Sequence, residues 1–135
     1  MSFARLFRMR ATKAVLLPAV AAVAVAGTMS ACSPVSTPKT IAKNVMYTYG
    51  WGDAQQFSCL DSLWTRESNW NPYAANPSSG AYGIPQSLPA SKMASAGPDW
   101  ATNPETQIRW GLTYIQGRYG NPCGAWSHSM SYGWY

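Results

Sequence analysis

One acidic residue of this chain, Glu67, lies where a carboxyl group would hold a proton more readily than usual. Residues 57–67 have the apolar spacing of a helix, and residues 69–72 then break the pattern. The carboxylate therefore falls at a helix C-terminus, which repels negative charge, between the indole rings of Trp64 and Trp70. Both the helix end and the loss of water raise the pKa of a carboxyl group, and a partly protonated glutamic acid can act as a general acid. The alternative is a surface glutamate paired with the preceding arginine.

The other acidic residues offer no obvious partner for Glu67 in a two-carboxylate reaction. Some acid–base reactions need a second carboxyl group held within roughly 10 Å of the first. Asp61 lies six positions before Glu67, which is about 600° around a helix of about 3.6 residues per turn and therefore off its face. Asp53 caps the start of the same helix, and Asp99 and Glu105 lie near the start of a later one. The sequence therefore favours chemistry carried by one carboxyl group.

Capping and turn residues predict the elements that position Glu67. Asp53 followed by Gln56 is typical of a helix N-terminus, and this helix is expected to end near Glu67. Residues 76–80 have the composition of a turn, and residues 81–86 are expected to form a loop or a small β-hairpin.

Two further helices are predicted. A short one is expected over residues 89–96, and a longer one begins at Asn103-Pro104 and ends at Gly120. Residues 124–135 have no clear period. The buried stripe of the long helix is expected to contain Ile108, Leu112, Ile115 and Tyr119, with Trp110 and Tyr114 on another face. The fold class predicted is mainly α, in one small domain with a single disulfide.

The first part of the chain is typical of an export signal. The net charge of +5 comes largely from four basic residues before position 14. In the rest of the chain, six Lys and Arg are nearly balanced by five Asp and Glu. This distribution excludes a nucleic-acid ligand. The apolar run that follows is too short for a membrane span, so residues 1–31 are expected to be a signal peptide. Residues 29–32, Met-Ser-Ala-Cys, resemble a bacterial lipobox, so lipidation of Cys32 stays open, as does cleavage after Ala26.

The cysteines fit an exported protein. Of the three, Cys59 and Cys123 lie in the folded region and can pair, and Cys32 is left over. Together with His128, the sole histidine, two cysteines give three ligands, too few for a structural zinc site. We therefore expect no metal and no cofactor, and a structural role for His128.

The domain is expected to begin after a linker. Residues 32–47 contain prolines, serines and threonines and are expected to form a flexible tether. Residues 48–135 contain all seven tryptophans and few charges, which predicts a compact unit with an aromatic-lined cleft.

Two motifs of this domain resemble a known family. Glu67-Ser68 followed by Asn71-Pro72, and then residues 80–86 with the sequence GAYGIPQ, are similar to the soluble lytic transglycosylase (SLT-type) domain, which has a small lysozyme-like fold. The cysteine pair and the Gly-Trp-Tyr ending resemble small secreted actinobacterial members. Pro85 replaces the usual methionine, and the family's later Tyr-Asn motif is not found, so the far wall of the cleft is unassigned.

The resemblance implies a peptidoglycan glycan strand as the substrate and a monomeric enzyme, secreted or attached to the cell envelope, with any membrane attachment through a lipid on Cys32. Glu67 would cleave the β-1,4 bond between N-acetylmuramic acid and N-acetylglucosamine and release 1,6-anhydromuramyl ends. Two alternatives remain: a hydrolytic muramidase, and a non-catalytic peptidoglycan-binding or cell-surface protein.

The resemblance also implies roles for other residues. Ser68 would either orient the Glu67 carboxylate or bond to the backbone at the helix end. Gln86 would contact an N-acetyl group, and Gly80 and Gly83 would let the backbone approach the glycan or merely form a turn. The aromatic residues expected either to form sugar platforms or to belong to the core are Tyr82, Trp70 and Trp126.

Overall fold

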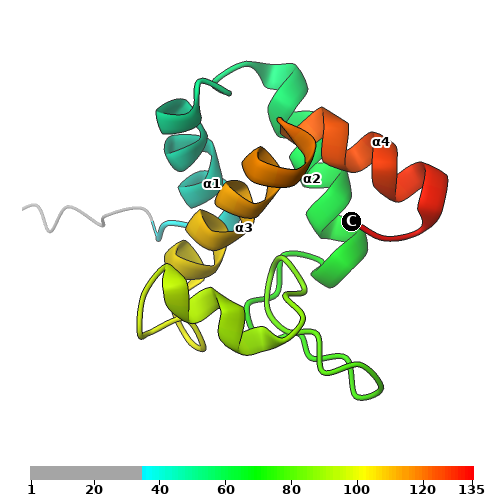
Figure 1. The fold of residues 1–135 in the computed structure, drawn as a ribbon. Coiled ribbons are helices and arrows are strands. Elements are labelled where there is room, and N and C mark those ends of the chain that lie inside the picture. Colours follow the sequence, from blue (N-terminus) through cyan, green and yellow to red (C-terminus); the bar gives the residue numbers. More distant parts are fainter. Residues whose placement is uncertain (1–34) are drawn as a thin grey trace, which may run out of the picture. The chain divides into compact units, whose positions relative to one another are not determined.

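The computed structural model describes residues 35–135, which form a mainly helical unit, as predicted. The signal peptide and Cys32 lie outside the described residues. No extended strand occurs in residues 35–135; instead Tyr82 forms isolated bridges with Ala75 and Ser87, which is the loop alternative of the prediction. None of the helices in this part of the chain has the length and apolarity needed to cross a membrane. In chain order the elements are α1 (Pro38–Met46), η1 (Tyr47–Tyr49), α2 (Ala54–Ser68), η2 (Ala90–Ser95), α3 (Pro104–Tyr119) and α4 (Pro122–Tyr132), where η marks a 3-10 helix (Figure 1).

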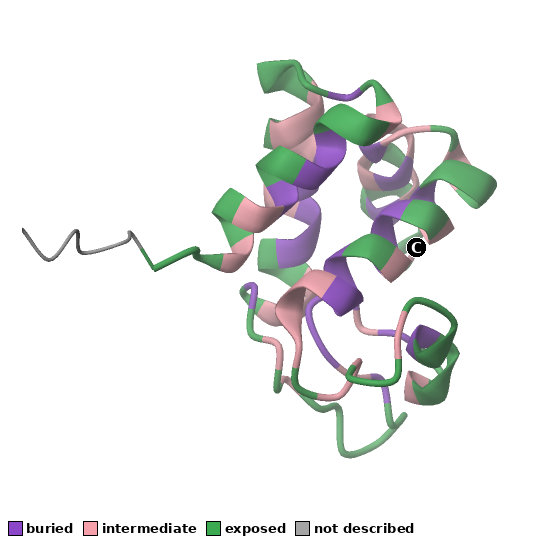
Figure 2. Ribbon diagram, turned by 90° about the vertical axis from the view of Figure 1, so that its left-hand side faces the viewer, coloured by how far each residue is buried: buried purple, intermediate pink, exposed green. Residues whose placement is uncertain are grey.

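Helix α3 forms the centre of the core. Asn103 caps it through a hydrogen bond to the backbone N–H of Glu105, and Gly120 ends it, as the sequence predicted. The predicted stripe is confirmed at three positions that are fully buried, and its last member, Tyr119, is partly exposed. Helix α3 contacts α1 and α4, and α4 in turn contacts α2, so the buried sides of the helices face one another (Figures 1 and 2).

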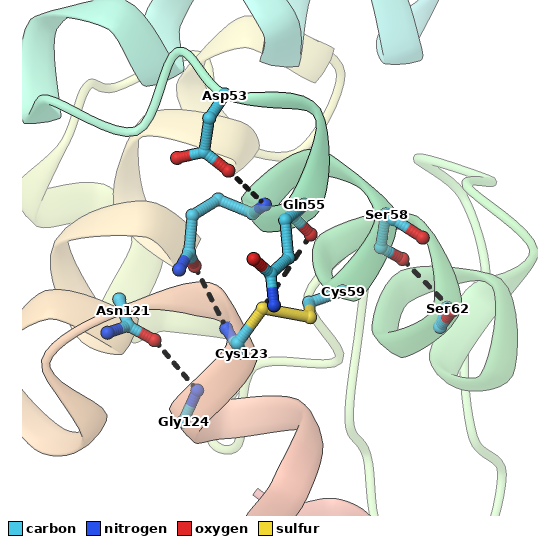
Figure 3. Close-up of a disulfide and its surroundings, with 9 residues drawn as sticks. Asp53, Gln55, Ser58, Cys59, Ser62, Asn121, Cys123 and Gly124 are labelled. Carbon is cyan, nitrogen blue, oxygen red and sulfur yellow. Dashed lines mark hydrogen bonds between the residues drawn. A yellow bond between two sulfur atoms is a disulfide. The ribbon is translucent and has the colours of Figure 1, made fainter.

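Helix α2 is fixed at its start to the beginning of α4. The Asp53 carboxylate accepts the backbone N–H of Gln56 at 2.8 Å, which confirms the predicted cap. The Gln56 side chain does not return to the cap; its Oε1 accepts the N–H of Cys123 at 3.1 Å. Beside this contact the predicted Cys59–Cys123 disulfide joins the two helices, with the Cα atoms 4.9 Å apart (Figure 3).

The prediction of a tether over residues 32–47 is wrong for its second half, because residues 38–46 form α1. Thr37 caps this helix and Pro38 occupies its first turn, where a missing N–H costs nothing. Ala42, Val45 and Met46 are buried against the core. Thr37 and Pro38, which suggested a linker, are therefore helix-start signals, and the few apolar residues that follow are enough for one short buried face.

No helix was expected over residues 124–135, which have no clear period, yet residues 122–132 form α4. Asn121 caps the helix by accepting the N–H of Gly124 at 2.8 Å, and Pro122 takes the first position. Ala125 and Ser129 are buried. At Gly133 the backbone is left-handed (φ 81°), a conformation that favours glycine, and the chain after it returns toward α2.

Candidate active site

Glu67 lies in the last turn of α2 and is half-buried. The chain leaves the helix sharply, because both Asn69 and Trp70 have left-handed backbones (φ 51° and 61°). Burial raises the pKa of Glu67 above its ordinary value, and the positive charge of Arg66 opposes this only in part. Among the described residues no hydrogen bond or ion pair reaches the carboxylate, so its proton is not committed to a neighbouring group. The predicted direction of the pKa shift is thus confirmed.

The loop carrying the second motif is fastened to the end of α2. The Ser68 hydroxyl donates to the carbonyl of Ile84 at 2.8 Å and to that of Trp64 at 3.3 Å. Of the two roles expected for Ser68, the structure shows the hydrogen bond to the backbone and none to the Glu67 carboxylate. Ser68 therefore holds the loop against the turn of helix that carries Glu67.

Gln107, a fully buried residue of α3, fixes the same loop from the other side. Its Oε1 accepts the N–H of Ile84 at 2.9 Å, while its Nε2 donates to the carbonyls of Pro72 and Trp100 at 2.9 and 3.0 Å. This amide therefore satisfies polar backbone groups from three separate segments. Sequence reasoning missed it, because a glutamine next to the stripe residue Ile108 carries no signal of a long-range role.

The two motif glycines have different surroundings. A Cβ at Gly83 would lie 2.6 Å from Gln107 Oε1, and the backbone there is left-handed (φ 77°), so the loop needs glycine to approach Gln107. Gly80 lies in an exposed turn, where its N–H donates to Asn76 at 2.8 Å. Neither glycine lines a cavity described below, so their contact with glycan stays a prediction.

A cavity of about 90 Å³ opens beside the second motif. A larger cavity of about 390 Å³ adjoins it through two shared residues, Trp110 and Tyr114, whose rings stack with centroids 5.3 Å apart. Sequence analysis placed these two rings on a separate face of the helix without assigning them a role. The residues lining the smaller cavity are Pro85, Gln86, Ser87, Leu88, Lys92, Trp110, Tyr114 and Tyr135.

Gln86 is the predicted glycan contact that does line this cavity. Its backbone is left-handed (φ 52°), and its side-chain Nε2 donates to the carbonyls of Ala74 and Gly83 at 3.1 and 2.9 Å. Both donor protons of the amide are therefore used within the loop, and the acceptor Oε1 has no partner among the described residues. This arrangement leaves an acceptor for a donor such as the N–H of an acetamido group.

Tyr135 lines the same cavity, whereas Glu67 is not among the residues that line it. Its hydroxyl accepts the indole N–H of Trp64 at 2.9 Å and donates to the carbonyl of Pro85 at 2.8 Å, so it joins α2 to the second motif. Burial, and after it the charge of Glu67, raises the pKa of the phenol well above its usual range, although the hydrogen bond from Trp64 opposes this. The phenol is thus within electrostatic reach of Glu67 while its ring lines the cavity.

The predicted aromatic platforms are not at the cavity. Trp70 is only 6% exposed, and its indole N–H donates to Asp61 at 2.8 Å, so it belongs to the core and cannot offer a ring face to a sugar. Trp126 packs against the core as a partly buried residue of α4. The hydroxyl of Tyr82 donates to Ala101 at 2.9 Å and its ring meets Trp100 edge-on, which anchors the loop.

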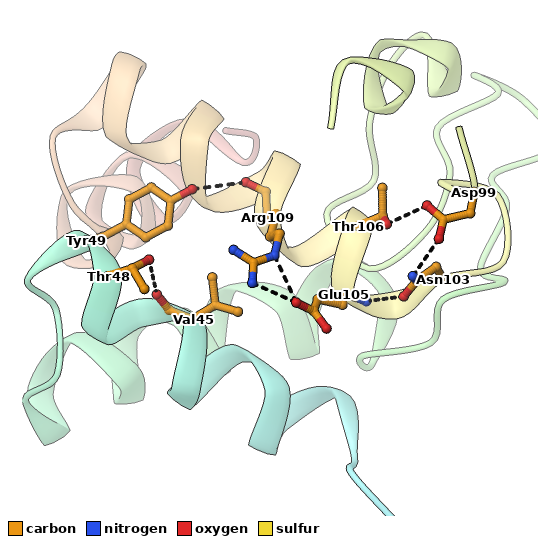
Figure 4. A network of polar contacts seen from close by, with 8 residues as sticks. All are labelled: Val45, Thr48, Tyr49, Asp99, Asn103, Glu105, Thr106 and Arg109. Carbon is orange, nitrogen blue, oxygen red and sulfur yellow. Dashed lines mark hydrogen bonds and ion pairs between the residues drawn. The ribbon is translucent and has the colours of Figure 1, made fainter. Parts of the chain in front are cut away.

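The four other acids of the chain are all engaged. Burial raises the pKa of Asp61, but the Lys39 ion pair and the hydrogen bonds from Trp70 and Thr65 together lower it. The Asp99 carboxylate accepts the Thr106 hydroxyl and the Asn103 amide, each at 2.7 Å, which lowers its pKa (Figure 4). Glu105 pairs with Arg109 at 2.7 Å, as Figure 4 also shows, and Asp53 caps α2. Among residues 35–135, Glu67 is therefore the one acidic side chain whose carboxylate has no hydrogen-bond or ion-pair partner.

Comparison with protein families agrees with these observations. Residues 47–133, more than half of the chain, match the model of the Transglycosylase SLT domain. Comparison with curated proteins and with solved structures gives no match. The matched range includes Glu67, both motifs, the disulfide and nearly all of the cavity lining.

Proposed function

This chain belongs to the Transglycosylase SLT family, a membership that implies peptidoglycan as the substrate, and we propose that it is a lytic transglycosylase with Glu67 as its catalytic residue. The bond cleaved is the β-1,4 linkage between N-acetylmuramic acid and N-acetylglucosamine. The observation that carries the proposal is the state of the five acids: four are held in ion pairs, caps or hydrogen bonds, and only Glu67 combines burial with an unengaged carboxylate.

The reaction needs two proton transfers, and Glu67 can perform both. The protonated carboxyl donates to the glycosidic oxygen, the bond from that oxygen to C1 of the muramic acid breaks, and N-acetylglucosamine leaves as an alcohol. The resulting carboxylate then takes the proton from the 6-hydroxyl of the same muramic acid, whose oxygen bonds to C1. The product is a 1,6-anhydro ring, no water is consumed, and Glu67 ends protonated again. An intramolecular hydroxyl has a high effective concentration, so it can outcompete water.

The raised pKa of Glu67 supports the first of these steps. A carboxyl group in water is almost fully ionised at neutral pH and has little proton to give. Burial disfavours the ionised form, so a larger share of Glu67 is protonated before the substrate binds. The hydrogen-bonded Ser68, Gln107 and Tyr135 keep the loop and the end of α2 in place, so the carboxyl does not have to be repositioned during the reaction.

The cavity beside the second motif is the proposed place for the sugars. Trp110 and Tyr114 present stacked rings to it, and apolar ring faces suit the C–H faces of pyranose rings. Gln86 adds a free acceptor for an acetamido N–H.

We also propose that the protein acts outside the cytoplasmic membrane. Its substrate is there, and the Cys59–Cys123 disulfide is of the kind that persists in oxidising compartments. The signal peptide over residues 1–31 and lipidation of Cys32 remain parts of this proposal.

The test is digestion of purified peptidoglycan followed by mass spectrometry of the soluble fragments. We expect muropeptides that are one water lighter than the hydrolysis product and that borohydride does not reduce. Glu67→Gln should lower the rate at least about 10²-fold, the usual contribution of general acid–base catalysis. Glu105→Gln is the matched control, because Glu105 is paired with Arg109 on the surface of α3. Reducing ends would identify a muramidase instead, and no products from folded protein would identify a binding protein.

A further inference from the structure

Lys92 is a cation without a partner in residues 35–135. It lies in η2, and no ion pair, ring contact or hydrogen bond reaches its ammonium group from the described residues. Residues 1–34 contain no acidic residue. The contacts of the other five cations are Lys39 with Asp61, Lys43 with the Phe57 ring, Arg66 with the Ser129 carbonyl, Arg109 with Glu105, and Arg118 with the Trp134 ring.

The position of Lys92 makes this lack of a partner informative. It lines the cavity that also holds Gln86, the stacked Trp110 and Tyr114, and Tyr135. The lining therefore combines ring faces, one free amide acceptor and one unpaired positive charge. The ring faces and the amide acceptor suit a neutral sugar, which has no use for the positive charge. An anionic group carried by a sugar would be bound by that charge.

We propose that Lys92 binds a carboxylate carried by the muramic acid residue of the glycan. This inference rests on the proposed function, because it assumes that the cavity holds peptidoglycan. Muramic acid bears a lactyl group that ends in a carboxylate when the stem peptide is absent. When the peptide is present, its own carboxylates hang from the same position. An ammonium group is a compact charge with three N–H donors on a flexible stem, which suits a carboxylate whose exact position varies.

The consequence is selectivity among glycans that share the same backbone. A glycan built of N-acetylglucosamine alone has the acetamido groups and ring faces that the rest of the cavity can contact, but no carboxylate. Lys92 would therefore separate muramic-acid-containing strands from chitin-like strands. Since its side chain is exposed, the expected effect is modest and sensitive to salt.

The experiment measures binding to the full-length, disulfide-bonded Glu67→Gln protein, so that the ligand is not consumed. Three tetrasaccharides are compared: one with stem peptides, one with free lactyl carboxylates and one of N-acetylglucosamine only. Adding Lys92→Gln should weaken binding of a carboxylate-bearing ligand by about 2- to 5-fold at low salt and by almost nothing at about 1 M salt. Lys92→Arg should restore binding. Lys43→Gln is the matched control, because Lys43 lies over Phe57, away from this cavity.

The ligand that loses affinity identifies the group bound. A loss with the peptide-free muramic ligand assigns the lactyl carboxylate, and a loss with the peptide-bearing ligand assigns the stem peptide. No loss with either, or an equal loss with the N-acetylglucosamine tetramer, overturns the inference. The proposed function is tested separately by the wild-type digest: anhydro products with no effect of Lys92 would reject only this inference. A Lys92 effect on binding without any cleavage would reject only the catalytic proposal.

Discussion

Gly111, in the middle of α3, is a position where one added methyl group should lower stability. A Cβ there would lie 2.7 Å from Cζ2 of Trp64 and 3.1 Å from Cβ of Pro85. The Trp64 ring is fully buried and its indole N–H donates to Tyr135. The ring therefore cannot move aside without giving up a buried hydrogen bond. The close packing of the Trp64 ring and of Pro85 against α3 depends on the absence of a side chain at this position.

The expected magnitude follows from two opposing terms. Replacing glycine by alanine inside a helix ordinarily stabilises a protein by about 0.5–1 kcal/mol. Overpacking a buried site costs about 1–3 kcal/mol. The second term is larger, so Gly111→Ala should lower the free energy of unfolding by about 1–2 kcal/mol. Gly117→Ala is the matched control in the same helix, because a Cβ there meets nothing within 4 Å, and it should gain about 0.5–1 kcal/mol.

The assay is urea unfolding with the disulfide intact, followed by tryptophan fluorescence, together with peptidoglycan digestion. Trp64 lies one turn before Glu67 and Ser68, so a displaced ring would shift the carboxyl group proposed to be catalytic as well as the core. We therefore expect slower cleavage by Gly111→Ala and unchanged cleavage by Gly117→Ala. If both alanine variants gained the same stability, the Trp64 ring would not be packed against α3 as described, and the reasoning would fail.

Three further predictions concern the same core. Tyr135→Phe leaves the buried indole N–H of Trp64 unpaired and should lower the free energy of unfolding in urea by about 1–3 kcal/mol. Tyr132→Phe, at an exposed position, is the control, and equal unfolding midpoints for the two variants would contradict this reasoning. Removing the disulfide with Cys59→Ser and Cys123→Ser should cost about 4 kcal/mol for a loop of this length, and free thiols in peptide maps of the wild type would refute the pairing. Because burial raises the pKa of Glu67 in the folded state, its ionisation favours unfolding. Glu67→Gln should therefore gain stability over wild type as pH rises above about 4.5, with no gain below it; a difference independent of pH would contradict the shift.

The elements that could be predicted are those whose ends are fixed by local chemistry. The cap at Asp53, the Asn103-Pro104 start of α3 and its end at Gly120 all depend on residues within a few positions of one another. The same kind of signal was present at both missed helices, where a capping residue precedes a proline. At the first of them the prolines and polar residues are equally typical of a linker, and at the second the apolar residues have no clear period. In each case burial against α2 or α3 stabilises a helix whose own pattern is weak.

The parts of the site that could not be predicted depend on contacts between distant positions. Glu67 and its raised pKa follow from its own neighbours in sequence. Tyr135, by contrast, reaches Trp64 across 71 positions, and Gln107 reaches Ile84 across 23. No local pattern indicates which tyrosine or glutamine will be buried beside the motif. For the same reason the sequence leaves Trp70 open between a sugar platform and the core, and the structure places it in the core.

A single acid can both give and take a proton only if no neighbouring group holds it permanently in one protonation state. Asp61 and Asp99 illustrate the opposite case, since hydrogen bonds and, for Asp61, an ion pair hold each in its ionised form and lower its pKa. Glu67 differs because burial acts on it without such partners, so its pKa moves in the other direction. The nearby Tyr135 hydroxyl does not compete for the proton, because it is already bound to Trp64 and Pro85. Because Glu67 has no such partner, its ionised form lowers the stability of the folded state. For the same reason the proton of its neutral form is available to a glycosidic oxygen.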